Sequence, residues 1–302
     1  MSLKRSGVCV SEAAESDRLL PHDNQNRMPW FIPYRMAIKK KIKKVLQDNN
    51  IYLPIRYSFF FRLYQRIFKS GDVAAEKKEI DFYKSFFSSC GLIFDIGAYD
   101  GHKTAAFLHI ARKVVCVEPD KENFKVLGIR FRHKKDRVYL ENKAVSNVAG
   151  TSYMHIHHPA SAFNTLSDNW KDILESDNVE KWNEKISFPE RVLVETITLD
   201  QLIEKYGRPD FIKIDVEGLE EKVLQGLSSR VSCLTFEAML PDGLEAIHNC
   251  LDQIERLDTD ARFNVAEYEQ LLFEKFVSFD EIRNWLAVSR ITHFEIVVKM
   301  NL

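Results

Sequence analysis

The sequence lacks the features that would place it in a membrane, a secretory pathway or a nucleic-acid complex. No apolar run approaches the ~18 residues that a membrane-spanning helix needs. The polar N-terminus has no apolar stretch typical of a secretory signal. The formal net charge is -1, so no overall field favours nucleic acid as a partner. We therefore expect a cytoplasmic protein without a nucleic-acid partner.

Cysteine is also scarce, and its spacing excludes the common zinc motifs. The five cysteines form no C-x-x-C pair and no close Cys/His cluster, which predicts reduced, mostly buried thiols. His155 and His157 would share one face of a strand, a geometry compatible with a metal pair. No third ligand follows at a local spacing, so no metal site is predicted.

Composition along the chain predicts three regions. Residues 1–26 are polar without periodicity, which indicates a disordered tail. Residues 27–74 form a basic, aromatic helical extension, with eleven Lys or Arg and one acid between Arg27 and Lys69. This extension either packs its aromatic stripe on the main domain or forms a peripheral surface for anionic lipid or a lipid-linked substrate. Residues 75–302 form the main domain.

Within the main domain, short apolar strands alternate with helical stretches. Five of the expected strands are contained in "LIFDI", "KVVCVEPD", "RVYLENKAV", "DFIKIDV" and "SCLTFEA". Two more strand-like stretches, "ARFNVAEYE" and "HFEIVVKM", lie near the C-terminus. Continuous apolar strands between helices are typical of a parallel sheet covered on both faces. The sequence predicts an α/β, Rossmann-like fold with a mostly parallel seven-stranded sheet, plus the helical N-terminal extension.

The first strand ends in a glycine turn, "FDIGAYDG", which has the form D-x-G-x-x-x-G. In a doubly wound sheet this turn is the default ligand cradle. It differs from the dinucleotide fingerprint, because Tyr99 and Asp100 place bulk and negative charge where a pyrophosphate would lie. Asp95 adds a second carboxylate. The turn therefore suits a zwitterion with an ammonium group better than a diphosphate.

The second and third strands end in residues suited to a nucleoside. Glu118 follows Gly97 by twenty-one residues, a spacing that fits a carboxylate accepting the hydroxyls of a ribose. Together with the glycine turn, this indicates S-adenosylmethionine. Asn142, after the third strand, can both donate and accept a hydrogen bond, as reading an adenine edge requires. The same residue types also occur as ordinary strand ends and turns.

The fourth strand leads into the most specific motif, "FIKIDVEGLEEKVLQGL". Asp215 and Glu217 would lie at the carboxyl end of the strand, beside the ligand crevice, and Gly218 permits a tight turn into a helix. Two acids and a glycine at a strand end lower stability unless a cationic or hydroxyl-bearing ligand uses them. The alternative is that these residues only begin a helix and bind no ligand.

These motifs together resemble the FkbM-type family of S-adenosylmethionine-dependent methyltransferases. The matching stretches occur in the family's order over roughly residues 92–240: "FDIGAYDG", "VVCVEPD" followed by Asn123-Phe124, "ENKAVSNVAG", "NTLS", "TLDQL" and "FIKIDVEGLEEKVLQG". The resemblance implies methylation of a hydroxyl, typically of a sugar or polyketide-type acceptor. One departure is Tyr99, where the family commonly has Asn.

Residue by residue, the resemblance implies Asp95, Gly97 and Gly101 around the methionine part, Glu118 on the ribose, and Asp215 near the reacting centre. The full predicted cofactor-binding set is Asp95, Gly97, Ala98, Tyr99, Gly101, Glu118, Pro119, Asn142, Ala144 and Asp215.

Transfer to a hydroxyl benefits from a general base within hydrogen-bond reach. The candidates, in order, are Asp215, Glu237 at the end of the fifth strand, and His102 after the second glycine. The segment from Ala160 to Glu190 carries Trp170 and could form an acceptor wall or pack as an ordinary insertion. The sequence predicts an O-methyltransferase acting on a saccharide or similar small molecule. The alternatives are a nicotinamide-dependent oxidoreductase and a non-catalytic module that binds a membrane or glycolipid.

Overall fold

The computed structural model describes residues 70–87, 90–176 and 185–302. The residues described all belong to one compact unit, residues 53–302. The expected N-terminal tail and the basic stretch between Arg27 and Lys69 lie outside the described residues. Among the residues described, no helix is both long and apolar enough to span a membrane.

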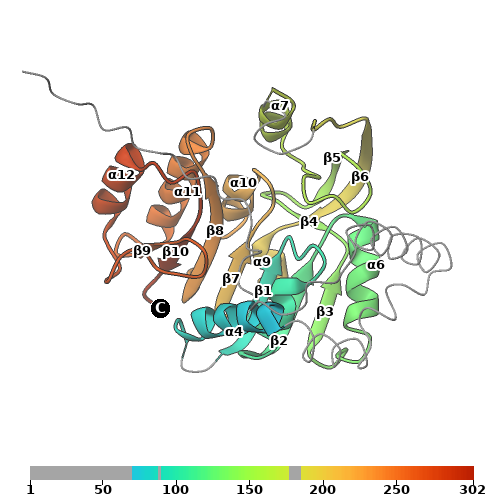
Figure 1. The fold of residues 1–302 in the computed structure, drawn as a ribbon, viewed down its shortest axis with the longest axis horizontal. Coiled ribbons are helices and arrows are strands. Elements are labelled where there is room, and N and C mark those ends of the chain that lie inside the picture. Colours follow the sequence, from blue (N-terminus) through green and yellow to red (C-terminus); the bar gives the residue numbers. More distant parts are fainter. Residues whose placement is uncertain (1–69, 88–89, 177–184) are drawn as a thin grey trace, which may run out of the picture. The chain divides into compact units, whose positions relative to one another are not determined.

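A seven-stranded sheet forms the centre of this unit (Figure 1). Its strand order is β3-β2-β1-β7-β8-β10-β9. In chain order these strands are β1 (Cys90–Ile96), β2 (Ala111–Val117), β3 (Val138–Glu141), β7 (Phe211–Ile214), β8 (Cys233–Met239), β9 (Arg262–Ala266) and β10 (His293–Lys299). β10 runs antiparallel to both of its neighbours, β8 and β9, and the other strand pairs of this sheet are parallel. The predicted α/β, mostly parallel seven-stranded architecture is confirmed.

Helices cover both faces of this sheet. On one face lie α4 (Ser70–Lys84), α5 (His102–Phe107) and α6 (Lys121–Arg130), and on the other lie α9 (Leu199–Tyr206), α10 (Glu220–Gln225), α11 (Leu244–Leu257) and α12 (Phe279–Val288). Alternate residues of β1 serve the two cores: Ile93 packs with the first helix set and Phe94 with the second. Both side chains are fully buried, as expected for a strand that is covered by helices on both faces. Helix α4 supplies the expected N-terminal helix.

Local signals in the sequence fix the starts of several helices. Asp120, the last residue of "VVCVEPD", caps α6 by accepting hydrogen bonds from the backbone N–H groups of Glu122 and Asn123. Thr198 and Gln201, in the motif "TLDQL", form a reciprocal capping box at the start of α9. Two of the motifs that carried the family resemblance therefore have a structural role at helix starts.

A second, three-stranded sheet was not expected from the sequence. It consists of β4 (Ala144–Val145), β6 (Glu190–Ile197) and β5 (Gly150–Ile156), in that order, and α7 (Asp168–Ser176) lies between β5 and β6 in the chain. "RVYLENKAV" was expected to be one strand, but its two ends belong to different sheets. Asn142 lies at the break, where its side-chain amide donates to the carbonyls of Glu118 and Pro119.

The glycine turn after β1 lies against the end of β7. Gly97 has a φ of 78°, and a Cβ added to it would lie 1.7 Å from the carbonyl oxygen of Asp215. Only glycine can occupy this position without moving the neighbouring backbone. The ends of β1 and β7 are thereby held in direct contact, where the chain connection reverses direction in the sheet.

Replacing Gly97 by alanine should therefore destabilise the protein strongly. Gly97→Ala is expected to lower the free energy of unfolding by at least about 2 kcal/mol, because it combines a backbone clash with an unfavourable φ. Gly128→Ala is the matched control, since Gly128 lies in α6 with nothing within 4 Å of an added Cβ. This control should gain about 0.5–1 kcal/mol. Urea unfolding of both variants is the measurement, and equal effects would contradict the assigned contact.

Candidate active site

A pocket opens at the carboxyl ends of β1, β2 and β7, between the main sheet and the small sheet. Its empty volume is about 780 Å³, open to solvent. The lining residues are Ile96, Gly97, Tyr99, Val117, Glu118, Pro119, Asn123, Lys143, Ala144, Val145, Met154, Ser161, Ala162, Asn164, Leu166, Asp215, Val216, Glu217 and Leu219. The location is the one that the order of a doubly wound sheet favours for ligands. We call it the first pocket.

Six of the predicted cofactor residues line the first pocket, and four do not. Those that line it are Gly97, Tyr99, Glu118, Pro119, Ala144 and Asp215, whereas Asp95, Ala98, Gly101 and Asn142 lie behind its wall. Gly101 has a support role, since a Cβ added to it would meet the Phe131 ring at 2.6 Å. Asn142 directs its amide N–H groups to backbone carbonyls, so its proposed adenine contact stays a prediction.

Glu118 is the buried carboxylate of this pocket, with 6% of its surface exposed. One oxygen accepts the backbone N–H of Tyr99 at 2.8 Å, and the other accepts the backbone N–H of Asp120 at 2.9 Å. Each oxygen keeps a further lone pair that could accept a hydroxyl. Burial raises the pKa of Glu118 to about 7, against the lowering effect of the two backbone hydrogen bonds.

The backbone of Tyr99 adopts a left-handed conformation in this turn, with a φ of 49°. Its backbone N–H is the group that fixes Glu118, and its half-exposed side chain lines the first pocket. The negative charge of Asp100 also disfavours a dinucleotide at this turn. Its carboxylate accepts a hydrogen bond from the guanidinium of Arg130 on α6.

A buried lysine lies beneath the site. Lys213 of β7 is 2% exposed and donates a hydrogen bond to the carboxylate of Asp215. Its register partner in β1 is Asp95, which is 1% exposed. Burial alone would lower the pKa of Lys213, but the carboxylates of Asp215, Glu295 and Asp95 raise it above its ordinary value. Lys213 in turn keeps the pKa of Asp215 low despite burial.

Three carboxylates converge at the carboxyl ends of β7 and β8. One oxygen from each of Asp215, Glu217 and Glu237 lies within 4.8 Å of the others, close enough to ligate one cation, and within the described chain this is the only such group of His, Cys, Asp or Glu. Lys213 already pairs with Asp215, and His293 pairs with Glu237 at 2.6 Å. Two of the three carboxylates therefore have a cationic partner within the protein.

Two of these three carboxyl groups, Glu217 and Glu237, have raised pKa values. Burial, followed by repulsion from Glu237 and Asp215, raises the pKa of Glu217 well above its ordinary value. Burial and the Asp215 charge also raise the pKa of Glu237, which His293 only partly offsets. Both shifts favour the protonated form, so these two carboxyl groups bind a proton more readily than an ordinary glutamate does.

The three candidate bases occupy different places. Asp215 lines the first pocket. Glu237 lines a second pocket, of about 540 Å³ and also open to solvent, on the other side of the turn after β7. His102 lines neither pocket, because its ring pairs with Glu79 of α4 at 3.1 Å. Its hydrogen bond to Glu79 raises the pKa of His102, and the geometry gives it a role in attaching α4 rather than in reaching a substrate.

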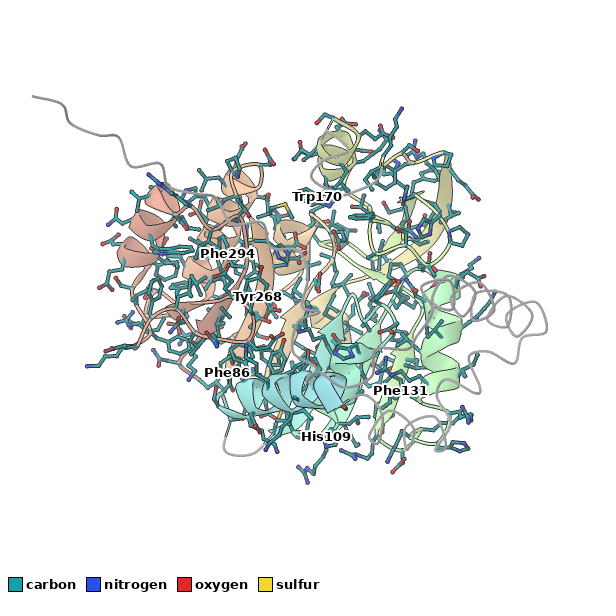
Figure 2. The ribbon with its side chains drawn as sticks, in the orientation of Figure 1. Phe86, His109, Phe131, Trp170, Tyr268 and Phe294 are labelled. Atoms are coloured by element: carbon teal, nitrogen blue, oxygen red, sulfur yellow. The ribbon has the colours of Figure 1, made fainter. Side chains whose placement is uncertain are left out.

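Two contacts near the carboxylates were not predicted from the sequence. His293 begins β10, and the antiparallel pairing of β10 with β8 brings it beside Glu237. Trp170 of α7, labelled in Figure 2, donates through its ring N–H to Glu217 at 3.3 Å. No local spacing signals either contact, since each joins segments about fifty residues apart. Lys213 did carry a signal, as a lysine inside a four-residue strand buried along its length.

The strand order, the single antiparallel strand and a pocket with a buried acid after β2 define a class: the S-adenosylmethionine-dependent methyltransferases of the class I fold. The chain belongs to the FkbM methyltransferase family. The model of the methyltransferase FkbM domain matches residues 95–292. The family assignment excludes the nicotinamide-dependent oxidoreductase that the sequence left as an alternative. A comparison with curated protein sequences gives no match.

Several solved structures are similar to this chain at low identity. The methyltransferase FkbM from Methylobacillus flagellatus is 14% identical with a TM-score of 0.41, over 69% of this chain and 43% of that one. Precorrin-6y C5,15-methyltransferase from Geobacter metallireducens is 12% identical with a TM-score of 0.36, over 75% and 86%. The O-methyltransferase from Bacillus cereus, in complex with SAH, is 12% identical with a TM-score of 0.35, over 75% and 80%. The chain thus spans less than half of the Methylobacillus protein.

The residues of the first pocket fit the cofactor that the family implies. Glu118 offers a lone pair on each oxygen to two neighbouring hydroxyls, and the ionised Asp215 suits a molecule that carries positive charge. Gly97 leaves no side chain between the turn and the end of β7. Apolar lining from Val117, Ala144 and other residues suits the faces of an aromatic base.

Because ribose hydroxyls donate to an ionised carboxylate, cofactor affinity should depend on the proton of Glu118. Its pKa of about 7 predicts that the dissociation constant of S-adenosylhomocysteine rises by up to about tenfold per pH unit as the pH falls below 7. Above pH 7 the affinity should level off. Calorimetric titration from pH 8 to pH 5.5 measures this dependence. Glu118→Gln should bind more weakly at pH 8 and lose most of the slope, and an unchanged slope in this variant would exclude Glu118 as the titrating group.

The contact between His293 and Glu237 can be tested through the pKa of the His293 ring. The hydrogen bond to Glu237 raises the pKa of His293 above 6.5. In Glu237→Gln we expect the pKa of His293 to fall towards its ordinary value, because the negative charge is removed. The measurement is an NMR titration of the His293 ring protons, assigned with His293→Gln. His102 is the control, since its ring pairs with Glu79 and its pKa should be the same in both proteins. An unchanged pKa of His293 would show that the two groups do not interact in solution.

Proposed function

We propose that this protein is an O-methyltransferase of the FkbM type, which methylates a hydroxyl of a saccharide, glycoconjugate or similar small molecule. The observation that supports this most is the pair of pockets on either side of one carboxylate-bearing turn. Glu217 lines the first pocket, Glu237 lines the second, and their carboxylates approach within 4.8 Å. A cofactor in the first pocket and an acceptor in the second would therefore meet at these acids.

S-adenosylmethionine, when bound, supplies an activated methyl group whose transfer to a hydroxyl leaves S-adenosylhomocysteine and one proton. The protein's task is to orient the acceptor, exclude water and accept this proton. Glu237 is the group we assign to proton acceptance, since it lines the second pocket and its raised pKa makes it a stronger base than an ordinary carboxylate. His293, hydrogen-bonded to Glu237, holds the carboxylate in place and stabilises its charged form.

Asp215, ranked first from the sequence, takes a different part in this proposal. Its carboxylate is hydrogen-bonded to the buried Lys213, which lowers its pKa and makes it a weaker base than Glu237. We assign Asp215 to orienting the methionine end of the cofactor or the acceptor hydroxyl from the wall of the first pocket. The ranking of the two carboxylates is thus reversed by the position of one lysine.

Glu237→Gln should separate catalysis from cofactor binding. Loss of a general base lowers kcat by about 10²–10⁴-fold, whereas the affinity for S-adenosylmethionine should change by less than about threefold, since Glu237 does not line the first pocket. Transfer of labelled methyl from S-adenosylmethionine to a panel of neutral methyl glycosides and polyols measures the rate, and calorimetry measures the affinity.

Glu245→Gln is the matched control, because Glu245 is an exposed acid on α11 that lines neither pocket. It should behave as the unaltered protein. Equal rates for Glu237→Gln and the control would remove Glu237 as the base. A purified protein that does not bind S-adenosylmethionine, or that binds it equally well as Glu118→Ala, would overturn the proposed function itself.

A further inference from the structure

The segment between β5 and α7 lies along the first pocket. Residues 161–167, which we call the strap, supply four of its lining residues: Ser161, Ala162, Asn164 and Leu166. The strap contains the motif "NTLS", which belonged to the family resemblance and has no part in the proposed chemistry. Asn164 and Thr165 are neighbours in this motif, but their side chains bind different parts of the chain.

Asn164 ties the strap to the residues that follow β2. Its side-chain amide donates to the carboxylate of Asp120 at 2.9 Å and to the carbonyl of His158 at 3.1 Å. Its amide oxygen accepts the backbone N–H of His157 at 2.9 Å. Asp120 is buried, and its backbone N–H donates in turn to Glu118. A hydrogen-bonded path therefore leads from the strap to the acid that we expect to hold the ribose.

Thr165 ties the strap to the turn after β7. Its side chain is buried, and its hydroxyl donates to the carbonyl of Glu217 at 2.7 Å while it accepts the backbone N–H of Ser167 at 2.9 Å. The backbone N–H and C=O of Thr165 both pair with His155, near the end of β5. Glu217 has a φ of 54°, in the left-handed region that few residues except glycine adopt. Contacts from outside the turn are therefore needed to hold it.

These two contacts lie on either side of β1. In the sheet, β2 and β7 are the two neighbours of β1, so Asp120 and Glu217 belong to chain segments that flank the glycine turn. One peptide bond joins Asn164 to Thr165, and the strap therefore sets the distance between these two walls. The segment that the sequence left open as an acceptor wall or an insertion thus lines both pockets, through the strap in the first and Trp170 in the second.

We infer that the strap presets the first pocket for S-adenosylmethionine by tying its two walls together, with Asn164 and Thr165 as positioning residues. This inference rests on the cofactor binding that the proposed function requires, and it adds the residues that prepare the site. A pocket already held at its bound width loses less conformational entropy on binding than one whose walls move independently. Because Thr165 does not line the pocket, its effect on cofactor affinity must pass through the strap.

Cutting either tie should weaken binding, and cutting both should weaken it no further. Thr165→Val removes the hydroxyl that reaches Glu217, and Asn164→Ala removes the amide that reaches Asp120. Each variant should raise the dissociation constant of S-adenosylhomocysteine by about five- to tenfold, within the net free energy of one hydrogen bond. The double variant should show the same factor, because a tie cut at one end is already lost. Calorimetry at pH 8 is the measurement, and independent effects, which would multiply to about 25- to 100-fold, overturn the inference.

Two further variants separate positioning from general stability. Thr165→Ser keeps the hydroxyl and should bind S-adenosylhomocysteine as the unaltered protein does. Thr196→Val is the matched control, because Thr196 is a buried threonine of β6 that lines neither pocket and donates to the carbonyl of Val148 at 2.9 Å. It loses the same kind of hydrogen bond outside the strap, so its affinity should change by less than about twofold. Equal weakening by Thr196→Val and Thr165→Val contradicts the inference.

A spectroscopic readout tests the tie to the turn without any cofactor. The ring N–H of Trp170, labelled in Figure 2, donates to the carboxylate of Glu217 at 3.3 Å, so the NMR signal of this N–H reports the position of the turn. In the ligand-free protein the signal, assigned with Trp170→Phe, should move in Thr165→Val and stay in place in Thr165→Ser. A signal that does not move in Thr165→Val contradicts the tie.

The inference and the proposed function fail in different ways. Absence of S-adenosylhomocysteine binding by the unaltered protein overturns both. Unchanged affinity in Thr165→Val or in Asn164→Ala overturns the strap alone and leaves the proposed function standing. Because Asn164→Ala cuts the other end of the strap, it keeps the inference testable if Thr165→Val does not fold.

Discussion

The buried ammonium of Lys213 is the constraint on which the carboxylate edge depends. A lysine that is 2% exposed in the middle of a strand costs stability unless carboxylates surround it. Asp215 supplies a direct hydrogen bond, and Asp95 lies beside it in the next strand. The lysine in turn keeps Asp215 ionised at a strand end, so the pair places a fixed negative charge at the wall of the first pocket.

The order of the strands places the other residues of the site around the pair of Lys213 and Asp215. Gly97 brings the turn after β1 into contact with the backbone of Asp215, which joins the cofactor-facing turn to the end of β7. Strand β8 pairs with β7 and ends at Glu237, and β10 then brings His293 to that carboxylate. Two pockets share this edge, one with a buried nucleoside-type acid and one with an apolar wall. A single turn, the one after β7, separates the two pockets.

Much of the fold and part of the site could be predicted from residues close together in sequence. The glycine turn, Glu118 after the second strand and Asp215 after the fourth each follow a buried strand directly, and parallel strands bring such ends to one edge. His102 shows the limit of this reasoning. It follows the glycine turn as a base would, but a partner on α4, twenty-three residues earlier, turns its ring to Glu79. Asn142 likewise serves the backbone after β2.

The sequence by itself determined the sheet, the family and the acids that follow the strands, because strand periodicity, turn glycines and helix caps act between near neighbours. Only the tertiary structure showed that Lys213 pairs with Asp215 and His293 with Glu237, the contacts that help to set the pKa of each acid. It also decided that a second sheet and Trp170 wall the two pockets. The physical reason is that charge pairing and burial depend on groups distant in the chain, whose approach is set by strand order and crossover path.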